Sequence, residues 1–198
     1  MSRVKAFKEF SWWLQDNMCL INMLYNLPLF RVHFVDFVVA LAMKQPAPFF
    51  VSYAHHDSSD AERFLTTLEP LLRTSSEFAF SRWMDHQLLP GDYYLAEINQ
   101  AIEHSRFGLI LVSPALLASG FILRNELPAL LGKGMVVPVE LQRIVFDGSM
   151  DLKGLESRQV FRDSRRRSFD ACRTIPDRRA FALDLFSKIV ALLRRNPC

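Results

Sequence analysis

The sequence predicts an α/β fold in which a doubly wound, five-stranded parallel sheet carries helices on both faces. Short apolar runs alternate with longer segments whose apolar residues recur every three or four positions, as expected for alternating strands and helices. The run FGLILVS at 107–113 is apolar on both faces of a strand, which is typical of a buried parallel sheet. With 198 residues, half of them hydrophobic, the chain has enough apolar surface for one ordinary domain and a short appendage.

The predicted elements follow one another in regular order from residue 47. A helix is expected at 57–72, where Phe64, Leu65 and Leu68 have helical spacing and Asp and Ser stand at the start as caps. Further helices are expected around Leu95 and Ile98 and at 177–195. The five predicted strands lie at 47–54, 78–85, 107–113, 135–141 and 158–164.

Residues 1–46 differ in composition from the rest and are set apart by PAP at 46–48. Phe7, Phe10 and Leu14 have helical spacing, so the segment is expected to be helical and to break before Pro28. Two interpretations stay open: a genuine helical N-terminal extension, or a mis-assigned start with Met43 as the natural first residue. The expected domains are therefore 1–46 and 47–198.

Composition excludes several function classes. The net charge of +3 is too small to indicate a nucleic-acid partner, and the basic run RRR at 165–167 favours a solvated surface over a phosphate-binding patch. Three scattered cysteines without a CxxC motif predict neither a zinc site nor a disulfide framework, which fits a reducing cytoplasm. No apolar run approaches the roughly 20 residues of a membrane span.

Ligands of such sheets bind beyond the carboxyl ends of the strands. GxGxxG, P-loop and GxSxG motifs are absent from the sequence. The polar and aromatic side chains at the carboxyl ends of the predicted strands suit a sugar or nucleotide ligand. A core role for Trp83 is equally open, and Asp57 is expected to cap the following helix. The candidates at this edge are Ser52, Tyr53, His55, His56, Asp57, Trp83, Asp85, Ser119 and Glu126.

Four stretches in the expected order resemble a Toll/interleukin receptor (TIR) domain of the bacterial branch. FFVSYAHHDSSDAERF resembles the family's first strand and helix, and WMDHQLLPGDYYLAEI resembles its second strand and following loop. FGLILVSPALLASGFILRNELPALL resembles the third strand and the segment with the functional glutamate, and MVVPVEL the fourth strand. The resemblance spans residues 47–195 and implies a flavodoxin-like TIR fold.

The resemblance also implies an activity. Enzymatic TIR domains cleave NAD+ to nicotinamide and ADP-ribose or a cyclic isomer, in many bacteria as antiphage defence, whereas others are non-catalytic scaffolds. Glu126 matches the catalytic glutamate, NAD+ is the substrate, and no cofactor is expected. The family's Trp and Cys before this glutamate are replaced by Phe121 and Ile122. The expected substrate-binding residues are Ser52, Tyr53, Trp83, Asp85, Ser119 and Phe121.

The resemblance further implies assembly. The loop after the second strand is expected to reach a neighbouring TIR domain, and a separate sensor or effector protein is a possible partner. The assembly residues are Leu88, Leu89, Pro90 and Gly91, although both leucines tucking under their own loop is an equal alternative.

The stretch LLASGFILRNELPALL at 116–131 is expected to break at Gly120 and to begin a new helix with Asn125 as cap. Pro128 then falls in the first turn, where its missing N–H costs little. Glu126 is interpreted either as a charge that the helix dipole favours or as a catalytic group. A carboxylate facing an oxocarbenium-like transition state stabilises it electrostatically, which favours the catalytic role for Glu126.

Overall fold

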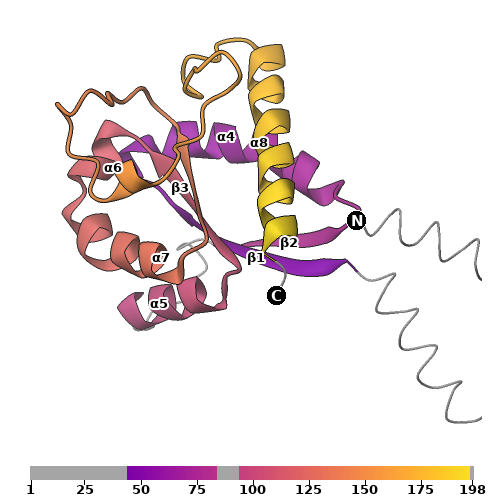
Figure 1. The fold of residues 1–198 in the computed structure, drawn as a ribbon, viewed down its shortest axis with the longest axis horizontal. Coiled ribbons are helices and arrows are strands. Elements are labelled where there is room, and N and C mark those ends of the chain that lie inside the picture. The colour runs from indigo at the N-terminus through magenta and orange to yellow at the C-terminus, as the bar shows by residue number, and fades with distance from the viewer. Residues whose placement is uncertain (1–43, 84–93, 197–198) are drawn as a thin grey trace, which may run out of the picture. The chain divides into compact units, whose positions relative to one another are not determined.

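The computed structural model describes residues 44–83 and 94–196, and Pro46–Cys198 form one compact unit (Figure 1). The predicted N-terminal helices and the predicted assembly loop therefore lie outside the described residues. Among the described helices, none combines the length and the apolar character that crossing a membrane requires.

Four strands form the sheet in the described part of the chain, in the order β2-β1-β3-β4. They are β1 (Gln45–Ser52), β2 (Phe78–Trp83), β3 (Phe107–Val112) and β4 (Val136–Glu140). The β1–β3 and β3–β4 pairs are parallel, with Ser52 opposite Ile110 and Val112 opposite Glu140. The α/β class and the parallel sheet predicted from the sequence are confirmed.

The predicted fifth strand at 158–164 is reduced to a single parallel bridge between Val139 and Phe161. Phe161 donates its N–H to Pro138 O (2.7 Å) and accepts from Glu140 N (3.0 Å), as a fifth strand beside β4 would. The ladder stops on one side because Pro138 has no N–H. It stops on the other because Phe169 N donates to Glu140 O (2.9 Å), the acceptor that the ladder would need next.

Helices cover both faces of the sheet, so the doubly wound arrangement is confirmed (Figure 1). Every second strand residue, such as Phe49 and Leu109, points to one face of the sheet. These residues pack against the helices α4 (Ser58–Arg73) and α8 (Ile175–Arg195), which cover that face. Their neighbours, such as Phe50 and Ile110, pack with the other face's helices. Those helices are α5 (Tyr94–His104), α6 (Pro114–Ala118) and α7 (Leu127–Lys133).

The segment from α6 to α7 differs from its prediction at two residues, because the helix is interrupted at Ser119 and not at Gly120, and Asn125 does not begin a new helix. The helix resumes at Gly120, widens into a π turn over Ile122–Glu126 and runs directly into α7. Asn125 is not a cap: it lies inside the π turn, and its Nδ2 donates to Phe121 O at 3.0 Å. Pro128 lies in the first turn of α7, as predicted, and the wider turn before it suits a residue that offers no N–H.

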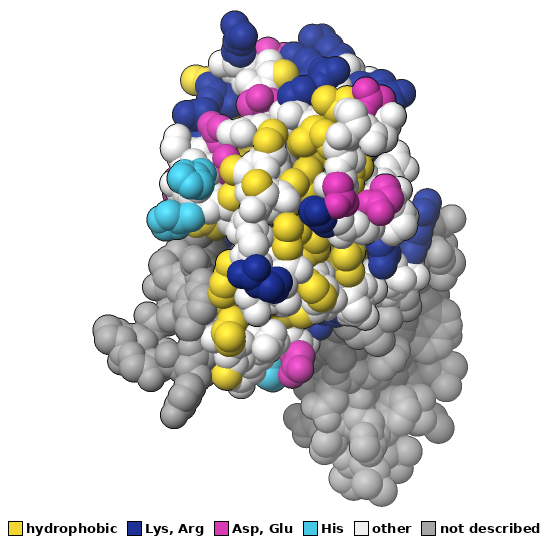
Figure 2. Space-filling view, turned by 90° about the vertical axis from the view of Figure 1, so that its left-hand side faces the viewer, with side chains coloured by type: hydrophobic (Ala, Val, Ile, Leu, Met, Phe, Trp, Pro, Cys, Tyr) yellow, Lys and Arg dark blue, Asp and Glu magenta, His cyan; other side chains and the backbone are white. Residues whose placement is uncertain are grey.

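Basic side chains concentrate near the start of α8. Figure 2 shows Lys and Arg side chains gathered at the top of the molecule, the end at which α8 begins in Figure 1. The segment leading to α8 contains Arg158, Arg162, Arg165, Arg166, Arg167 and Arg173. Their individual environments differ, because some of these arginines are paired with carboxylates and others are not.

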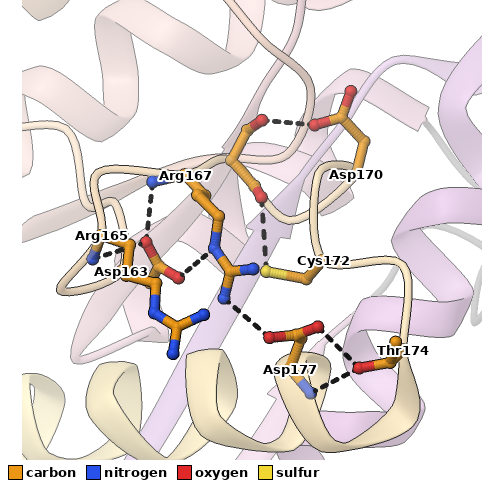
Figure 3. Close-up of polar contacts among 8 residues, drawn as sticks. Asp163, Arg165, Arg167, Asp170, Cys172, Thr174 and Asp177 are labelled. Carbon is orange, nitrogen blue, oxygen red and sulfur yellow. Dashed lines mark hydrogen bonds and ion pairs between the residues drawn. The ribbon is translucent and has the colours of Figure 1, made fainter.

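Arg167 ties the loop before α8 to the helix start (Figure 3). Its guanidinium contacts Asp163 at 2.8 Å and Asp177 at 3.0 Å, and these two bonds raise its pKa above the usual value. Thr174 caps α8 by accepting from Asp177 N at 3.2 Å, and its hydroxyl donates to Asp177 Oδ2 at 2.6 Å. Both hydrogen bonds to the Asp177 carboxylate lower its pKa, and the bond from Thr174 has the larger effect, ahead of the bond from Arg167.

Candidate active site

The strand order places a topological switch point between β1 and β3. From β1 the chain moves to β2 on one side of it and then returns to β3 on its other side. Ligands of open α/β sheets bind in the crevice at such a point, beyond the carboxyl ends of the strands. Ser52 is the last residue of β1, and Ser113 directly follows β3. Both serine hydroxyls therefore stand at the edge where a ligand is expected.

A hydroxyl and a carboxylate meet there. Ser52 Oγ donates to Glu126 Oε2 at 2.7 Å, and both residues are buried, with 1% and 8% of their surface exposed. β1 supplies the serine, and the last position of the π turn supplies the glutamate. A carboxylate with so little access to water needs a hydrogen-bond donor, and Ser52 provides one.

A second buried pair lies beside the first along the same edge. The Ser113 hydroxyl donates a short hydrogen bond to Asp57 Oδ2 and accepts from Leu116 N at 2.9 Å, which caps α6. Ser113 has no exposed surface and Asp57 has 5%. The pair links the 3₁₀ turn after β1 (His55–Asp57) to the residue that follows β3.

The expectation that Asp57 caps the following helix is wrong. Asp57 stands at the N-cap position of α4, but its side chain makes no capping bond. The preceding 3₁₀ turn leaves it at φ −97° and ψ 10°, whereas a capping side chain usually needs an extended backbone. Its carboxylate accepts from Ser113 instead.

Trp83, Ser119 and Phe121 lie on the same face of the sheet as the helices α5–α7. Trp83 ends β2 and stacks on Phe50, with ring centroids 5.0 Å apart and an angle of 16° between the planes. Phe121 packs partly buried against the same core cluster. Ser119 Oγ accepts from Ile122 N at 3.4 Å, at the start of the π turn that carries Glu126. This hydrogen bond from Ile122 connects Ser119 to the first residue of the π turn that ends at Glu126.

Tyr53 packs against the other core cluster, on the face covered by α4 and α8. Its ring therefore belongs to the opposite side of the sheet from Trp83 and Phe121, and the predicted grouping of these aromatic residues around one ligand does not extend to it. The predicted positions Asp85, Leu88, Leu89, Pro90 and Gly91 lie outside the described residues.

Two buried polar residues at this edge were not among the predicted site residues. Ser113 could have been found from its place between a buried strand and Pro114. Glu140 ends β4 with no exposed surface, where it contacts Arg162 Nε at 2.7 Å and accepts from Ile144 N at 3.0 Å. Glu140 could have been found as the one acidic residue in the apolar run MVVPVEL. Within the described residues, no cluster of His, Cys, Asp and Glu could hold a metal ion.

A family model described as the TIR domain matches residues 49–175, more than half of the chain. The chain belongs to the TIR domain family. The matched residues of this TIR domain include both buried hydroxyl–carboxylate pairs, the second half of β1 and all of β2, β3 and β4. Its parallel sheet with flanking helices agrees with the fold of the family, as the resemblance implied. A comparison with curated proteins gave no match.

Proposed function

We propose that this TIR domain cleaves NAD+ between nicotinamide and ribose. The observation that carries the proposal is the Glu126 carboxylate, hydrogen-bonded to Ser52 at the switch point of the sheet. Family membership supports it, since TIR domains include NAD+-cleaving enzymes. The products are nicotinamide and ADP-ribose or a cyclic ADP-ribose isomer, and the proposed setting is bacterial antiphage defence signalling in the cytoplasm.

The chemistry needs little beyond one well-placed carboxylate. The bond between the ribose carbon and the pyridinium nitrogen breaks, and its electron pair leaves with nicotinamide, which becomes neutral. No acid is required, because the leaving group is already cationic. The ribose is left with oxocarbenium character, which the negative charge of Glu126 stabilises. Water then adds and releases a proton to give ADP-ribose, or the adenine of the same molecule adds to give the cyclic product.

Ser52 orients the carboxylate in this proposal. A hydroxyl that donates to Oε2 holds the carboxylate in one rotamer. The burial of both residues limits competition from water, so the charge acts through a medium of low dielectric constant. Trp83, Ser119 and Phe121 are proposed as the surrounding wall, and Asp85, which lies outside the described residues, stays a proposed substrate contact.

The direct test is nicotinamide release, measured by chromatography, for the wild type and Glu126→Gln. The amide keeps the size of the side chain but removes the charge, and loss of one preorganised electrostatic group typically costs about 10²–10³-fold in rate. Thermal unfolding of both proteins provides the folding control. A folded Glu126→Gln protein with wild-type activity would overturn the proposal.

Assembly through the loop of Leu88, Leu89, Pro90 and Gly91 stays a proposal, as does a separate sensor or effector protein. The change Leu89→Asp is expected to abolish NAD+ cleavage while leaving a folded monomer. An active monomeric variant, judged by light scattering at the assay concentration, would contradict the requirement for assembly.

The alternative function is a non-catalytic TIR–TIR scaffold, in which Ser52 and Glu126 only hold the sheet edge together. Their burial is the observation that favours it. A wild-type protein that self-associates but releases no nicotinamide at high protein concentration, even under molecular crowding, would identify the scaffold.

A further inference from the structure

A pocket lies beside the edge of β4, outside the candidate active site described above. It has a volume of about 480 Å³, and its lining includes Arg158, Arg162, Arg166, Phe146 and Asp163. None of its lining residues belongs to the two buried hydroxyl–carboxylate pairs. The volume falls within the roughly 300–1,000 Å³ typical of small-molecule sites. Size therefore permits a ligand as large as a nucleotide.

Asp163 builds the turn that brings Arg166 to this pocket. Its Oδ1 accepts from the backbone N–H groups of Arg165 (3.0 Å) and Arg167 (2.7 Å), and its carbonyl accepts from Arg166 N (2.8 Å). Arg166 occupies the left-handed region, with φ 58°. The three consecutive arginines consequently differ: Arg167 pairs with Asp163 and Asp177, Arg166 lines the pocket, and Arg165 does not line it.

The carboxylates near the pocket are already engaged. Asp163 Oδ2 pairs with Arg167 at 2.8 Å (Figure 3), and the buried Glu140 pairs with Arg162 at 2.7 Å. Arg158 donates to the neutral carbonyl of Gly134 at 3.0 Å and forms no ion pair with the residues that the structure describes. The Arg166 guanidinium has no hydrogen bond or ion pair within the described residues. Two positive charges of the lining are thus available to an anion.

An aromatic ring completes the pocket. Phe146 is 43% exposed, and the Arg162 guanidinium carbon lies 4.0 Å from its ring centroid. The ion pair with Glu140 holds that guanidinium in place, so the ring is fixed from one side. A flat heterocycle can stack on exposed aromatic surface of this kind.

We propose that this pocket binds a nucleoside diphosphate, with the diphosphate held by Arg158 and Arg166 and the base stacked on Phe146. Guanidinium groups suit phosphate because their planar N–H donors match its oxygens. The sequence predicts a solvated surface for residues 165–167. Arg165 fits that prediction because it is exposed and does not line the pocket, whereas Arg166 is assigned to the ligand. The proposal does not depend on NAD+ cleavage.

Calorimetric titration of the full chain with ADP tests it, using the matched variants Arg166→Asn and Arg165→Asn. Both remove one positive charge from the same turn, and Asn tolerates the left-handed backbone at 166. We expect Arg166→Asn to weaken binding about tenfold or more, which corresponds to about 1.4 kcal/mol. Arg165→Asn should change the affinity less than about twofold at physiological salt, because Arg165 does not line the pocket and salt screens the charge of a side chain that makes no contact with the ligand.

Ligand variation and mapping complete the test. Inorganic pyrophosphate should compete with ADP, and adenosine should bind about tenfold more weakly or worse, because it lacks the groups that the arginines contact. Amide hydrogen exchange should slow at 144–167 on addition of ADP, also in Glu126→Gln, which separates this pocket from the proposed catalytic site. Equal losses in the two arginine variants, protection confined to 113–127, or absence of ADP binding would each overturn the proposal.

Discussion

Ser52 and Glu126, which are 74 positions apart in the chain, are joined by a buried hydrogen bond of 2.7 Å between Oγ and Oε2. The bond connects the carboxyl end of a central strand to the π turn that precedes α7. It therefore fixes the one carboxylate on which the proposed NAD+ cleavage depends.

Ser52→Ala should lower kcat for nicotinamide release with a smaller effect on KM, because the serine acts on the orientation of Glu126. We expect a loss of about tenfold or more, the order that removing a hydrogen bond to a charged group implies. Ser105→Ala is the matched control, since that buried hydroxyl donates to the carbonyl of Ala101 at the amino end of β3, away from the proposed site. In a double mutant with Glu126→Gln, Ser52→Ala should cost little further activity. Additive losses would contradict the coupling.

Ser113→Ala should lower the free energy of unfolding by about 1–3 kcal/mol, because it leaves the buried Asp57 carboxylate without its donor. It also removes the cap of α6, worth about 1 kcal/mol. Ser105→Ala provides the comparison, since that buried hydroxyl donates to the neutral carbonyl of Ala101. Urea unfolding measures both variants, and equal losses would show that the carboxylate does not need Ser113.

Gly108→Ala should destabilise the fold by about 1–3 kcal/mol through overpacking. A Cβ at Gly108 in β3 would lie 2.5 Å from Cδ2 of the buried Leu130 of α7. Gly132→Ala, at an exposed position of the same helix with nothing within 4 Å, should instead stabilise by about 0.5–1 kcal/mol. In a Leu130→Ala background most of the cost of Gly108→Ala should disappear. A persistent cost there would contradict the predicted clash.

Asp177 should make stability depend on pH in the acid range. Hydrogen bonds from Thr174 and Arg167 lower its folded-state pKa below the ordinary 3.8, so its contribution is present above that pH. The contribution is lost as pH falls through the depressed folded value. The unfolding free energies of wild type and Asp177→Asn should therefore differ at pH 6 and converge below pH 3.8.

Asp184→Asn, on the same helix, is the control for that experiment. Asp184 has no hydrogen bond or ion pair with the residues that the structure describes, and its variant should follow the wild type across the pH range. A difference between wild type and Asp177→Asn that does not change with pH would rule out the electrostatic origin.

The sequence predicted the fold class because its evidence is local. A buried strand such as 107–112 and the helical spacing of Phe64, Leu65 and Leu68 are each visible within a few residues. The failed predictions concern hydrogen bonds made elsewhere in the chain. The fifth strand is lost because Pro138 and Phe169 block its ladder, and the Asp57 carboxylate binds Ser113 instead of the helix that it precedes.

By itself, the sequence determined that alternating strands and helices build an α/β TIR domain, and it placed Glu126 in the segment that follows the third strand. Only the tertiary structure decided which groups that carboxylate and its neighbours contact. The order β2-β1-β3-β4 brings Ser52 to Glu126 and Asp57 to Ser113. Each pairing crosses more than 50 residues, and no local pattern records it, since a buried carboxylate takes whichever donor the packed elements bring within reach.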